Sequence, residues 1–217
     1  MAESSPNLRE RRAQLTRHEI LRAARHLFAD RGYARTSVRD IAKEAGVSAQ
    51  TVYDSVGSKP ELVMRLNDLI DVEADISGIV RAAASSGNPQ EMAAIAARIT
   101  RSILEHCEDI VRALVTGAAA EPDLAAVLAE GQRRHVEGAR RVAGMLGSMG
   151  ALRPGLEPHD AAETLAALSD VRYGLLLRES YGWSLDELER WITATSRTLV
   201  LASGARAGER DVRDAGG

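Results

Sequence analysis

Residues 36–53, TSVRDIAKEAGVSAQTVY, hold two short helical patterns separated by a glycine turn. Ser37 and Asp40 have the spacing of a helix cap, and apolar residues follow them at helical intervals. Gly46 can take the left-handed conformation that ends a helix, and Ser48 can cap a second helix directly after it. The stretch therefore predicts two short helices joined by a tight turn.

Two short helices joined in this way are typical of a helix-turn-helix, whose second helix enters the major groove of DNA. In that geometry Ala49, Gln50 and Thr51 face the base edges, and Tyr53 lies near a phosphate. Gln50 can pair with N6 and N7 of adenine, and Thr51 can donate to an acceptor or contact a thymine methyl. The spacing alone is equally compatible with a helical hairpin in any all-α protein.

Lys59 favours the nucleic-acid interpretation. The residues SKPE, 58–61, start another helix, with Pro60 in its first turn and Glu61 completing a cap. A lysine in a first turn opposes the helix dipole by roughly 0.3–1 kcal/mol, so its presence needs a reason. A DNA phosphate beside the same helix end would supply that reason.

Composition limits the class of protein. The chain has 217 residues, of which 45% are apolar, 27% charged and only 3% aromatic, a balance that favours a folded, helical protein. A single cysteine, Cys107, excludes an intrachain disulfide, and neither zinc-ligand spacing nor a signal-peptide or membrane-helix pattern is present. We therefore expect a soluble, cytoplasmic protein without a metal or cofactor.

Charge is distributed unevenly along the chain. Residues 1–60 carry eleven Lys or Arg against seven Asp or Glu, whereas the remainder carries seventeen against twenty-four. The N-terminal part is therefore the part that can approach phosphate, although so modest an excess is also common by chance.

Apolar periodicity predicts an all-α fold of about nine helices. The first helix is expected to begin at the cap Thr16–Glu19 and to end at Gly32. The fourth is expected to continue from Ser58 to about Val80, as a rod that links the helix-turn-helix to the rest of the chain. The remaining helices are expected over residues 88–106, from 109, over 122–146, over 158–182 and from 184.

The N-terminal motifs also carry a family resemblance. The segments ILRAARHLF, GYxxTSVRDIAxEAGVS, TVY and GSKxEL, all within residues 16–62, resemble the DNA-binding domain of the TetR family. The resemblance implies phosphate contacts from Thr36 or Ser37, Tyr53 and Lys59, and base or phosphate contacts from Arg39, Ser48, Gln50 and Thr51. The arginines near the N-terminus either add nonspecific binding or belong to a solvated tail.

Residues 54–56 depart from the family pattern, because Asp54-Ser55-Val56 stands where the family has a basic or polar residue, histidine and phenylalanine. Val56 is still an apolar anchor, though a smaller one. Asp54 is either a solvated carboxylate that weakens phosphate attraction or an acceptor for the N4 amine of cytosine.

The resemblance also implies a domain plan. We expect a flexible basic arm (1–13), a DNA-binding domain (14–74) with its helix-turn-helix at 37–56, an effector-binding and dimerisation domain (75–203) and a flexible tail (204–217). The last two long helices would pair with those of a second copy, although their apolar faces would also suit a monomer core. A two-fold dimer would bind a palindromic operator.

An effector site can be outlined only by residue type. The candidates are polar or polarizable groups near apolar helical runs, and each would also suit an ordinary surface or core role: His106, Cys107, Arg112, Asp170 and Tyr173. The effector itself is expected to be apolar or amphipathic.

Catalysis is not expected. His106 and Cys107 are neighbours, so their side chains diverge by about 100° on a helix and cannot act as base and nucleophile. The sequence thus predicts a dimeric, ligand-responsive transcriptional regulator, most simply a repressor bound to double-stranded operator DNA. Two alternatives are a DNA-binding architectural or cell-division factor without a small ligand, and an all-helical enzyme or scaffold that does not bind DNA.

Overall fold

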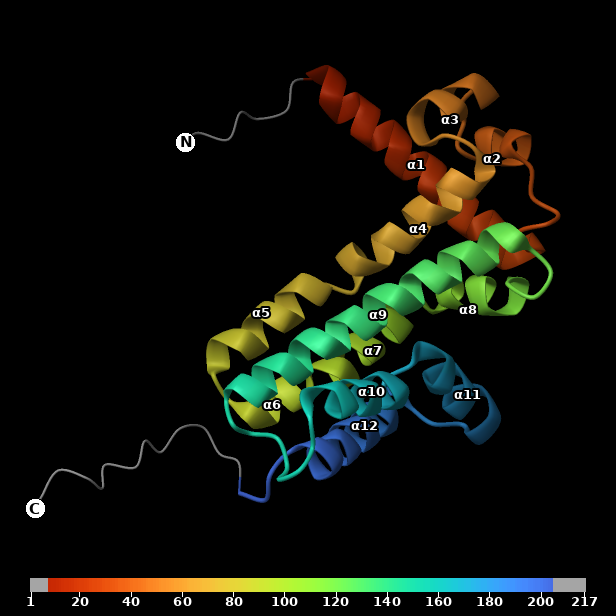
Figure 1. The fold of residues 1–217 in the computed structure, drawn as a ribbon. Helices are drawn as coiled ribbons and strands as arrows, with labels where there is room; N and C mark the ends of the chain where they lie inside the picture. Colours follow the sequence, from red (N-terminus) through yellow and green to blue (C-terminus); the bar gives the residue numbers. More distant parts are fainter. Residues whose placement is uncertain (1–7, 205–217) are drawn as a thin grey trace, which may run out of the picture. The chain divides into compact units, whose positions relative to one another are not determined.

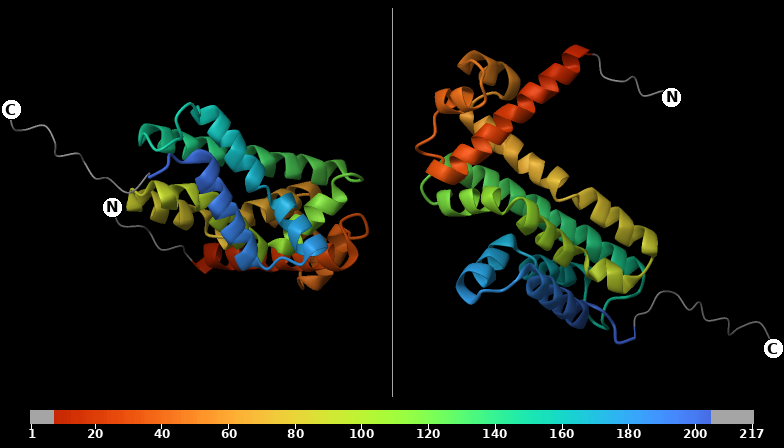
Figure 2. Two further views of the ribbon diagram at one scale, coloured as in Figure 1. Left: turned by 90° about the horizontal axis from the view of Figure 1, so that it is seen from below. Right: turned by 180° about the vertical axis from the view of Figure 1, so that it is seen from behind.

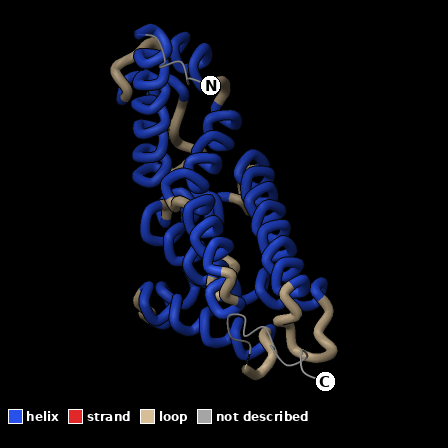
Figure 3. Tube along the Cα trace, turned by 90° about the vertical axis from the view of Figure 1, so that its left-hand side faces the viewer, coloured by secondary structure: helices blue, strands red, loops and turns tan. Residues whose placement is uncertain are grey.

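The computed structural model describes residues 8–204, and it confirms the all-α fold class (Figure 1). Twelve helices occupy this range, and the only strand-like feature within it is an isolated pairing of Leu152 with Leu201. Figure 3 shows the helices joined by short loops. None of the helices described is long and apolar enough to cross a membrane. Residues 1–7 of the predicted arm and 205–217 of the predicted tail lie outside the described range.

The chain divides into two compact units. The first comprises the residues up to Ile70 together with Glu108–Gly131, and the second comprises Asp71–Cys107 and the residues from Gln132 onward. The first unit thus includes a segment, residues 108–131, that the sequence assigned to the C-terminal domain.

The first unit is built around α1, which contacts α2, α3 and α8. Its helices are α1 (Leu8–Arg31), α2 (Val38–Glu44), α3 (Ala49–Val56), most of α4 (Lys59–Glu73), α8 (Glu108–Gly117) and the first turns of α9 (Pro122–Ser148). Each of the helices α1 to α4 contributes at least one completely buried apolar side chain, among them Ile20, Ile41, Val52 and Leu62. Burial of these side chains holds the short helices α2 and α3 in place, because helices this short are not stable alone.

The start of α1 differs from the prediction. The helix begins at Leu8 and passes through Thr16, which is therefore not its cap. Residues 8–15, LRERRAQL, consist almost entirely of good helix formers, so the helix continues upstream. Residues 8–13 of the predicted flexible arm are accordingly helical, while the buried residues of α1 begin only at Ile20.

The second unit packs α12 along α7 and α10, as the two views of Figure 2 show. It contains α5 (Ile76–Ser86), α6 (Pro89–Ala93), α7 (Ile95–His106), α10 (Pro158–Leu168), α11 (Val171–Tyr181) and α12 (Leu185–Val200), with the later turns of α9. Its core is rich in alanine, which lets the helices approach closely, and includes Ala93, Ala143, Ala161, Leu146, Leu165 and Val200.

Three predicted helices are each divided in two, which is why twelve helices are found instead of about nine. The predicted rod ends at Glu73, because Asp75 adopts a left-handed conformation with φ of 44° and its side chain caps α5 at Gly78. A short interruption at Ala94 separates α6 from α7. The third break lies before α11, where Asp170 accepts a hydrogen bond from the N–H of Arg172 and so starts a new helix.

Candidate nucleic-acid interface

The predicted helix-turn-helix is confirmed as α2, a turn and α3. Ser37 and Asp40 form a reciprocal capping box at the start of α2, with N···O distances of 3.2 and 2.9 Å. Hydrogen bonds from the Ser37 side chain and backbone lower the pKa of Asp40, so this cap is charged at neutral pH. Gly46 follows the C-terminal cap of α2 and has a left-handed φ of 67°. At the start of α3, the Ser48 hydroxyl accepts a hydrogen bond from the N–H of Thr51 at 3.0 Å.

The two faces of α3 differ in exposure. Val52 and Val56 are completely buried, whereas Gln50, Asp54 and Tyr53, which is 51% exposed, lie on the outer face. The outer face therefore carries an amide, a carboxylate and a phenol, all of which can contact DNA. Ala49 and Thr51 on α3 are half-buried, and Arg39 on α2 is exposed.

Two arginines hold the C-terminal end of α3. Arg17 of α1 donates from Nε to the carbonyl oxygen of Ser55 at 3.1 Å, and Arg65 of α4 donates to that of Val56 at 2.9 Å. Cations are favourable at this end because the helix dipole is negative there. The candidate recognition helix is thus fixed at both ends, by Ser48 and by the arginine pair.

Thr36 corrects one prediction. Its side chain is buried, with 1% of the residue exposed, and its hydroxyl donates to the carbonyl oxygens of Gly32 at 2.9 Å and Leu27 at 3.3 Å. A hydroxyl in this position cannot reach a phosphate, so the predicted phosphate contact from Thr36 is wrong. Thr36 instead satisfies carbonyls near the C-terminal end of α1. Ser37 is exposed and remains the candidate of the two.

Lys59 has a partner inside the protein. Its Nζ lies 3.8 Å from the centroid of the Tyr33 ring, and the carboxylates of Glu121 and Asp123 also attract it. Burial lowers the pKa of Lys59, and these two carboxylates oppose that shift. A cation over an aromatic ring is favourable by about 0.5–1 kcal/mol at exposed sites and more when desolvated. The presence of a cation in the first turn of α4 therefore has an internal explanation besides DNA phosphate.

Tyr33 links this lysine to α9. Its hydroxyl donates to Asp123 Oδ2 at 2.7 Å, and burial together with this hydrogen bond raises the pKa of Tyr33 above its ordinary value. A second link joins α1 to α8, where the Arg25 guanidinium binds both carboxylate oxygens of Asp109 at 2.5 and 2.6 Å. Both pairs lie within the first unit; one fixes the α8 segment against α1, and the other fixes the start of α9 against the loop that follows α1.

A small cavity lies beside these links. It has a volume of about 20 Å³ and is lined mainly by apolar side chains of α1, α4, α8 and α9, among them Phe28, Leu66, Ile110 and Leu114. Space of this size holds about one water molecule. It is too small for an organic effector.

Asp54 has a contact that the sequence analysis did not predict. Its carboxylate accepts a hydrogen bond from Gln50 Nε2 at 2.8 Å, one helical turn away. The i, i+4 spacing of a glutamine and an aspartate on a helix is a known signal for such a pair. Asp54 is therefore not simply a solvated carboxylate.

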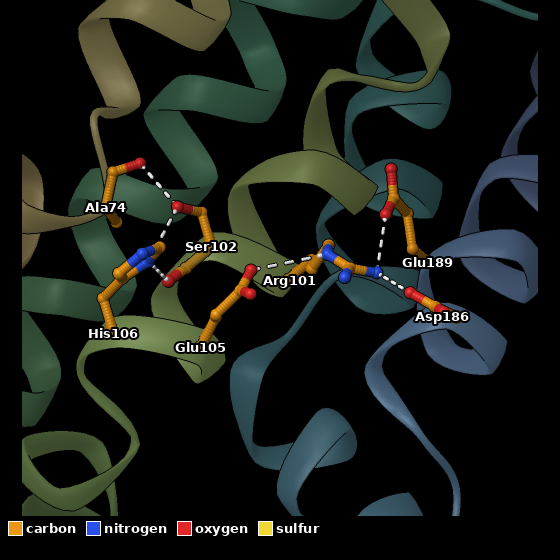
Figure 4. A network of polar contacts seen from close by, with 7 residues as sticks. All are labelled: Ala74, Arg101, Ser102, Glu105, His106, Asp186 and Glu189. Atoms are coloured by element: carbon orange, nitrogen blue, oxygen red, sulfur yellow. Dashed lines mark hydrogen bonds and ion pairs between the residues drawn. The ribbon is translucent and has the colours of Figure 1, made fainter.

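The effector candidate His106 belongs to a polar network on α7 (Figure 4). It is exposed, and its Nδ1 lies 2.9 Å from the carbonyl oxygen of Ser102 on the preceding turn. The Ser102 hydroxyl in turn donates to the carbonyl oxygen of Ala74 at 2.8 Å, in the break between α4 and α5. On the same helix Arg101 binds Asp186 and Glu189 of α12. Through Nδ1, His106 thus contacts its own helix.

Three of the other four effector candidates also have ordinary partners. Cys107 is buried and its Sγ lies 3.5 Å from Glu73 Oε2, while Arg112 pairs along α8 with Glu108 at 2.6 Å. Asp170 caps α11, and Tyr173 on that helix is 56% exposed. These contacts do not bring the five residues together as one site, and their effector role remains a prediction. Within residues 8–204, no three His, Cys, Asp or Glu side chains could hold a metal ion.

The comparison with known families identifies the N-terminal domain. Residues 20–66 match the model of the bacterial regulatory proteins of the tetR family. This domain belongs to the TetR family. The TetR-family match covers α2, α3 and the capped start of α4, which are the elements that carry the candidate interface.

Curated relatives of the TetR-family domain are transcriptional regulators. The HTH-type transcriptional regulator TtgR of Pseudomonas putida is 46% identical over 56 residues, which is 26% of this chain and 27% of that protein. The HTH-type transcriptional regulator TcmR of Streptomyces glaucescens is 34% identical over 68 residues, 31% of this chain and 30% of that protein. The matches thus span less than a third of the relatives' length and are limited to one domain.

Several solved structures resemble the chain over most of its length. A complex of SmeT with triclosan has a TM-score of 0.74 at 20% identity, covering 88% of this chain and 94% of that one. SmeT is named as the repressor of the Stenotrophomonas maltophilia multidrug efflux pump SmeDEF. A structure from Saccharomonospora viridis, in complex with choline, has a TM-score of 0.67 at 19% identity and covers 87% and 98% of the two chains. These likenesses establish the fold of the C-terminal part.

Proposed function

We propose that the protein is a sequence-specific DNA-binding transcriptional regulator, a repressor that leaves its operator when a small molecule binds. The observation that carries this proposal is the outer face of α3, where Gln50 and Tyr53 are exposed on a helix capped and anchored at both ends. A rigid helix that presents such side chains is suited to contact bases in the major groove. The family match of residues 20–66 supports the same role. The protein would then work by binding, not catalysis, in the cytoplasm where the DNA lies.

The proposed partner DNA is a palindromic operator bound by a homodimer. Apolar side chains exposed on α11 and α12 support dimerisation through the C-terminal helices: Tyr173, Leu176, Tyr181, Trp191 and Leu199. Exposed apolar groups concentrated on neighbouring elements are typical of protein interfaces. A two-fold dimer places two copies of α3 about 34–36 Å apart, one turn of the DNA helix.

The proposed effector is an apolar or amphipathic small molecule held by the second unit. Support comes from the fold likeness to SmeT, whose solved complex contains triclosan, and to a structure that contains choline. Binding would favour a dimer whose two α3 helices no longer match the groove spacing. By linkage, the effector must weaken DNA binding by the same factor by which DNA weakens effector binding, commonly 5–150-fold.

In vitro selection tests the proposal. The purified chain would be used to enrich a random duplex library at physiological salt, and the enriched sequences would be aligned. We expect a two-fold symmetric consensus and a dimer by light scattering at the concentrations used. Enrichment of no sequence at all, or binding of every duplex with equal affinity, would contradict a sequence-specific regulator and favour an architectural DNA-binding protein or one that does not bind DNA.

A further inference from the structure

The hydrogen bond between Gln50 and Asp54 constrains how the glutamine can face DNA. Gln50 Nε2 donates to Asp54 Oδ1 at 2.8 Å, and both residues lie on the exposed face of α3. An ionised carboxylate has only acceptor atoms, so it selects the NH2 side of the amide and turns Oε1 away. A solvated glutamine has no such preference, because its amide can turn over and present either edge.

When the Gln50 amide is fixed, it presents a defined pattern of hydrogen-bond donor and acceptor atoms to the solvent. One N–H of Gln50 is occupied by Asp54, which leaves one N–H donor and the Oε1 acceptor for DNA. In the major groove adenine offers the complementary pair, an acceptor at N7 and a donor at N6. Guanine offers two acceptors, N7 and O6. One of these would face the acceptor Oε1 with no hydrogen to join the two atoms, which disfavours guanine.

We propose that Asp54 is a specificity-determining residue, which holds the Gln50 amide in the orientation that accepts adenine and rejects guanine. The inference rests on the proposed function, since it concerns the base that the recognition helix contacts. Asp54 acts through Gln50 and need not touch the DNA itself. This role replaces the direct contact with cytosine that the sequence left open for Asp54.

The surroundings of the pair support this role. The hydroxyls of the cap residue Ser48 and of Thr51 in α3 are engaged with each other, because Ser48 Oγ and Thr51 Oγ1 are 2.8 Å apart. Arg17 and Arg65 hold the other end of the helix through its last carbonyls. The Gln50 amide is thus presented from a fixed helix, and a fixed donor and acceptor pattern discriminates between bases better than a mobile one.

A carboxylate at this position also has a cost for affinity. Asp54 faces the same side as Gln50 and Tyr53, where phosphates would lie, and like charges repel. The residue therefore weakens binding to every sequence while it excludes the wrong base. Such repulsive elements are a general means of gaining specificity.

The test compares the base preferences of four proteins by in vitro selection: the wild type, Gln50→Ala, Asp54→Ala and Asp54→Asn. The position at which Gln50→Ala loses its adenine preference identifies the base that Gln50 contacts. At that position we expect Asp54→Ala to lower the adenine-to-guanine ratio about tenfold, in line with the worth of a bidentate pair. Asp54→Asn retains an acceptor oxygen at the same place and should keep most of the preference.

Controls separate orientation from charge. Glu44→Gln removes a carboxylate from the exposed end of α2 in the same unit, so it should strengthen binding to all sequences without altering the ratio. The double variant Gln50→Ala, Asp54→Ala should match Gln50→Ala in base preference, because Asp54 then has no amide to orient. Position 54 is an exposed helical site where alanine is well tolerated, and circular dichroism checks the fold.

Three outcomes overturn the proposal. An unchanged ratio in Asp54→Ala, or no adenine preference lost in Gln50→Ala, would show that the pair does not set the base, even though the protein remains a sequence-specific regulator. A ratio that falls equally in Glu44→Gln would show a charge effect only. Failure of the wild type to enrich any sequence would instead remove the proposed function itself.

Discussion

Lys59 Nζ lies 3.8 Å from the centre of the Tyr33 ring, so the lysine in the first turn of α4 packs against an aromatic side chain of its own unit. This contact accounts for a cation at a helix end whose dipole disfavours it. An ammonium group over a ring still has N–H donors that can bind phosphate. The two roles are separable by experiment.

Lys59→Met keeps the apolar stem and removes the charge. We expect weaker binding to all duplexes by a similar factor, and a slope of log affinity against log salt smaller by about 1, because one phosphate contact is lost. Fluorescence anisotropy between 50 and 300 mM salt measures the slope. An unchanged slope with a lower stability would show that Lys59 serves only as the partner of Tyr33.

Tyr33→Phe keeps the ring under Lys59 and removes the hydroxyl that donates to Asp123. Hydrogen bonds to charged groups are worth about 1.5–3 kcal/mol, so we expect a loss near the lower value for this half-buried pair. Urea unfolding measures the free energy of unfolding. Asp123→Asn, which still offers an acceptor to Tyr33, should cost less, and a larger loss in Asp123→Asn would contradict this account.

Thr36→Val tests the correction to the predicted phosphate contacts. The change keeps the shape of the side chain but removes the hydroxyl that donates to Gly32 and Leu27, so we expect a loss of about 1 kcal/mol in unfolding free energy. The salt slope of DNA binding should stay the same, in contrast with Lys59→Met. A reduced slope with normal stability would restore Thr36 as a phosphate contact.

Asp170 gives the second unit a dependence on pH. Burial alone would raise the pKa of Asp170, but the Arg172 side chain and backbone N–H outweigh it and lower that pKa. The free energy that this carboxylate contributes is therefore present above its ordinary pKa, near 3.9, and is lost as the pH falls through the lowered value. At pH 7 the Asp170→Asn variant should have a lower free energy of unfolding than the wild type. This difference in unfolding free energy should become smaller as the pH falls. Urea titrations from pH 7 to pH 3 would refute this if the difference stayed constant.

Local signals explain which parts of the fold the sequence could predict. The caps Ser37, Ser48 and Ser184 each lie three residues before the group they bind, so the starts of α2, α3 and α12 follow from spacing alone. The start of α1 does not follow from spacing, because a cap-like sequence at Thr16 is also compatible with a helix interior when strong helix formers precede it.

Breaks within long apolar patterns were harder to predict. Asp75 interrupts the predicted rod because it adopts a left-handed conformation, which residues other than glycine seldom do. The neighbouring sequence therefore gave no basis for predicting this break. Ser169-Asp170 is different, because a serine and an aspartate together are a usable signal for a new helix start.

Pairs that depend on tertiary packing could not be predicted from local spacing. Tyr33, Lys59 and Asp123 come from three separate segments, and only the fold brings them together. Gln50 and Asp54 lie one turn apart on one helix, so their pairing could have been read from i, i+4 spacing. Contacts within one helix can therefore be predicted from the sequence of this chain, whereas contacts between separate segments cannot.

The ratio of affinities for the selected duplex and for a shuffled duplex of the same composition tests whether α3 is a recognition helix. Fluorescence anisotropy at 150 mM salt would measure both for the wild type and for Gln50→Ala. We predict that the wild type prefers the selected duplex by at least about a thousandfold, the lower end for specific DNA-binding proteins, and that Gln50→Ala loses a large part of this preference. Equal wild-type affinities for the two duplexes would contradict the assignment of α3 as a recognition helix.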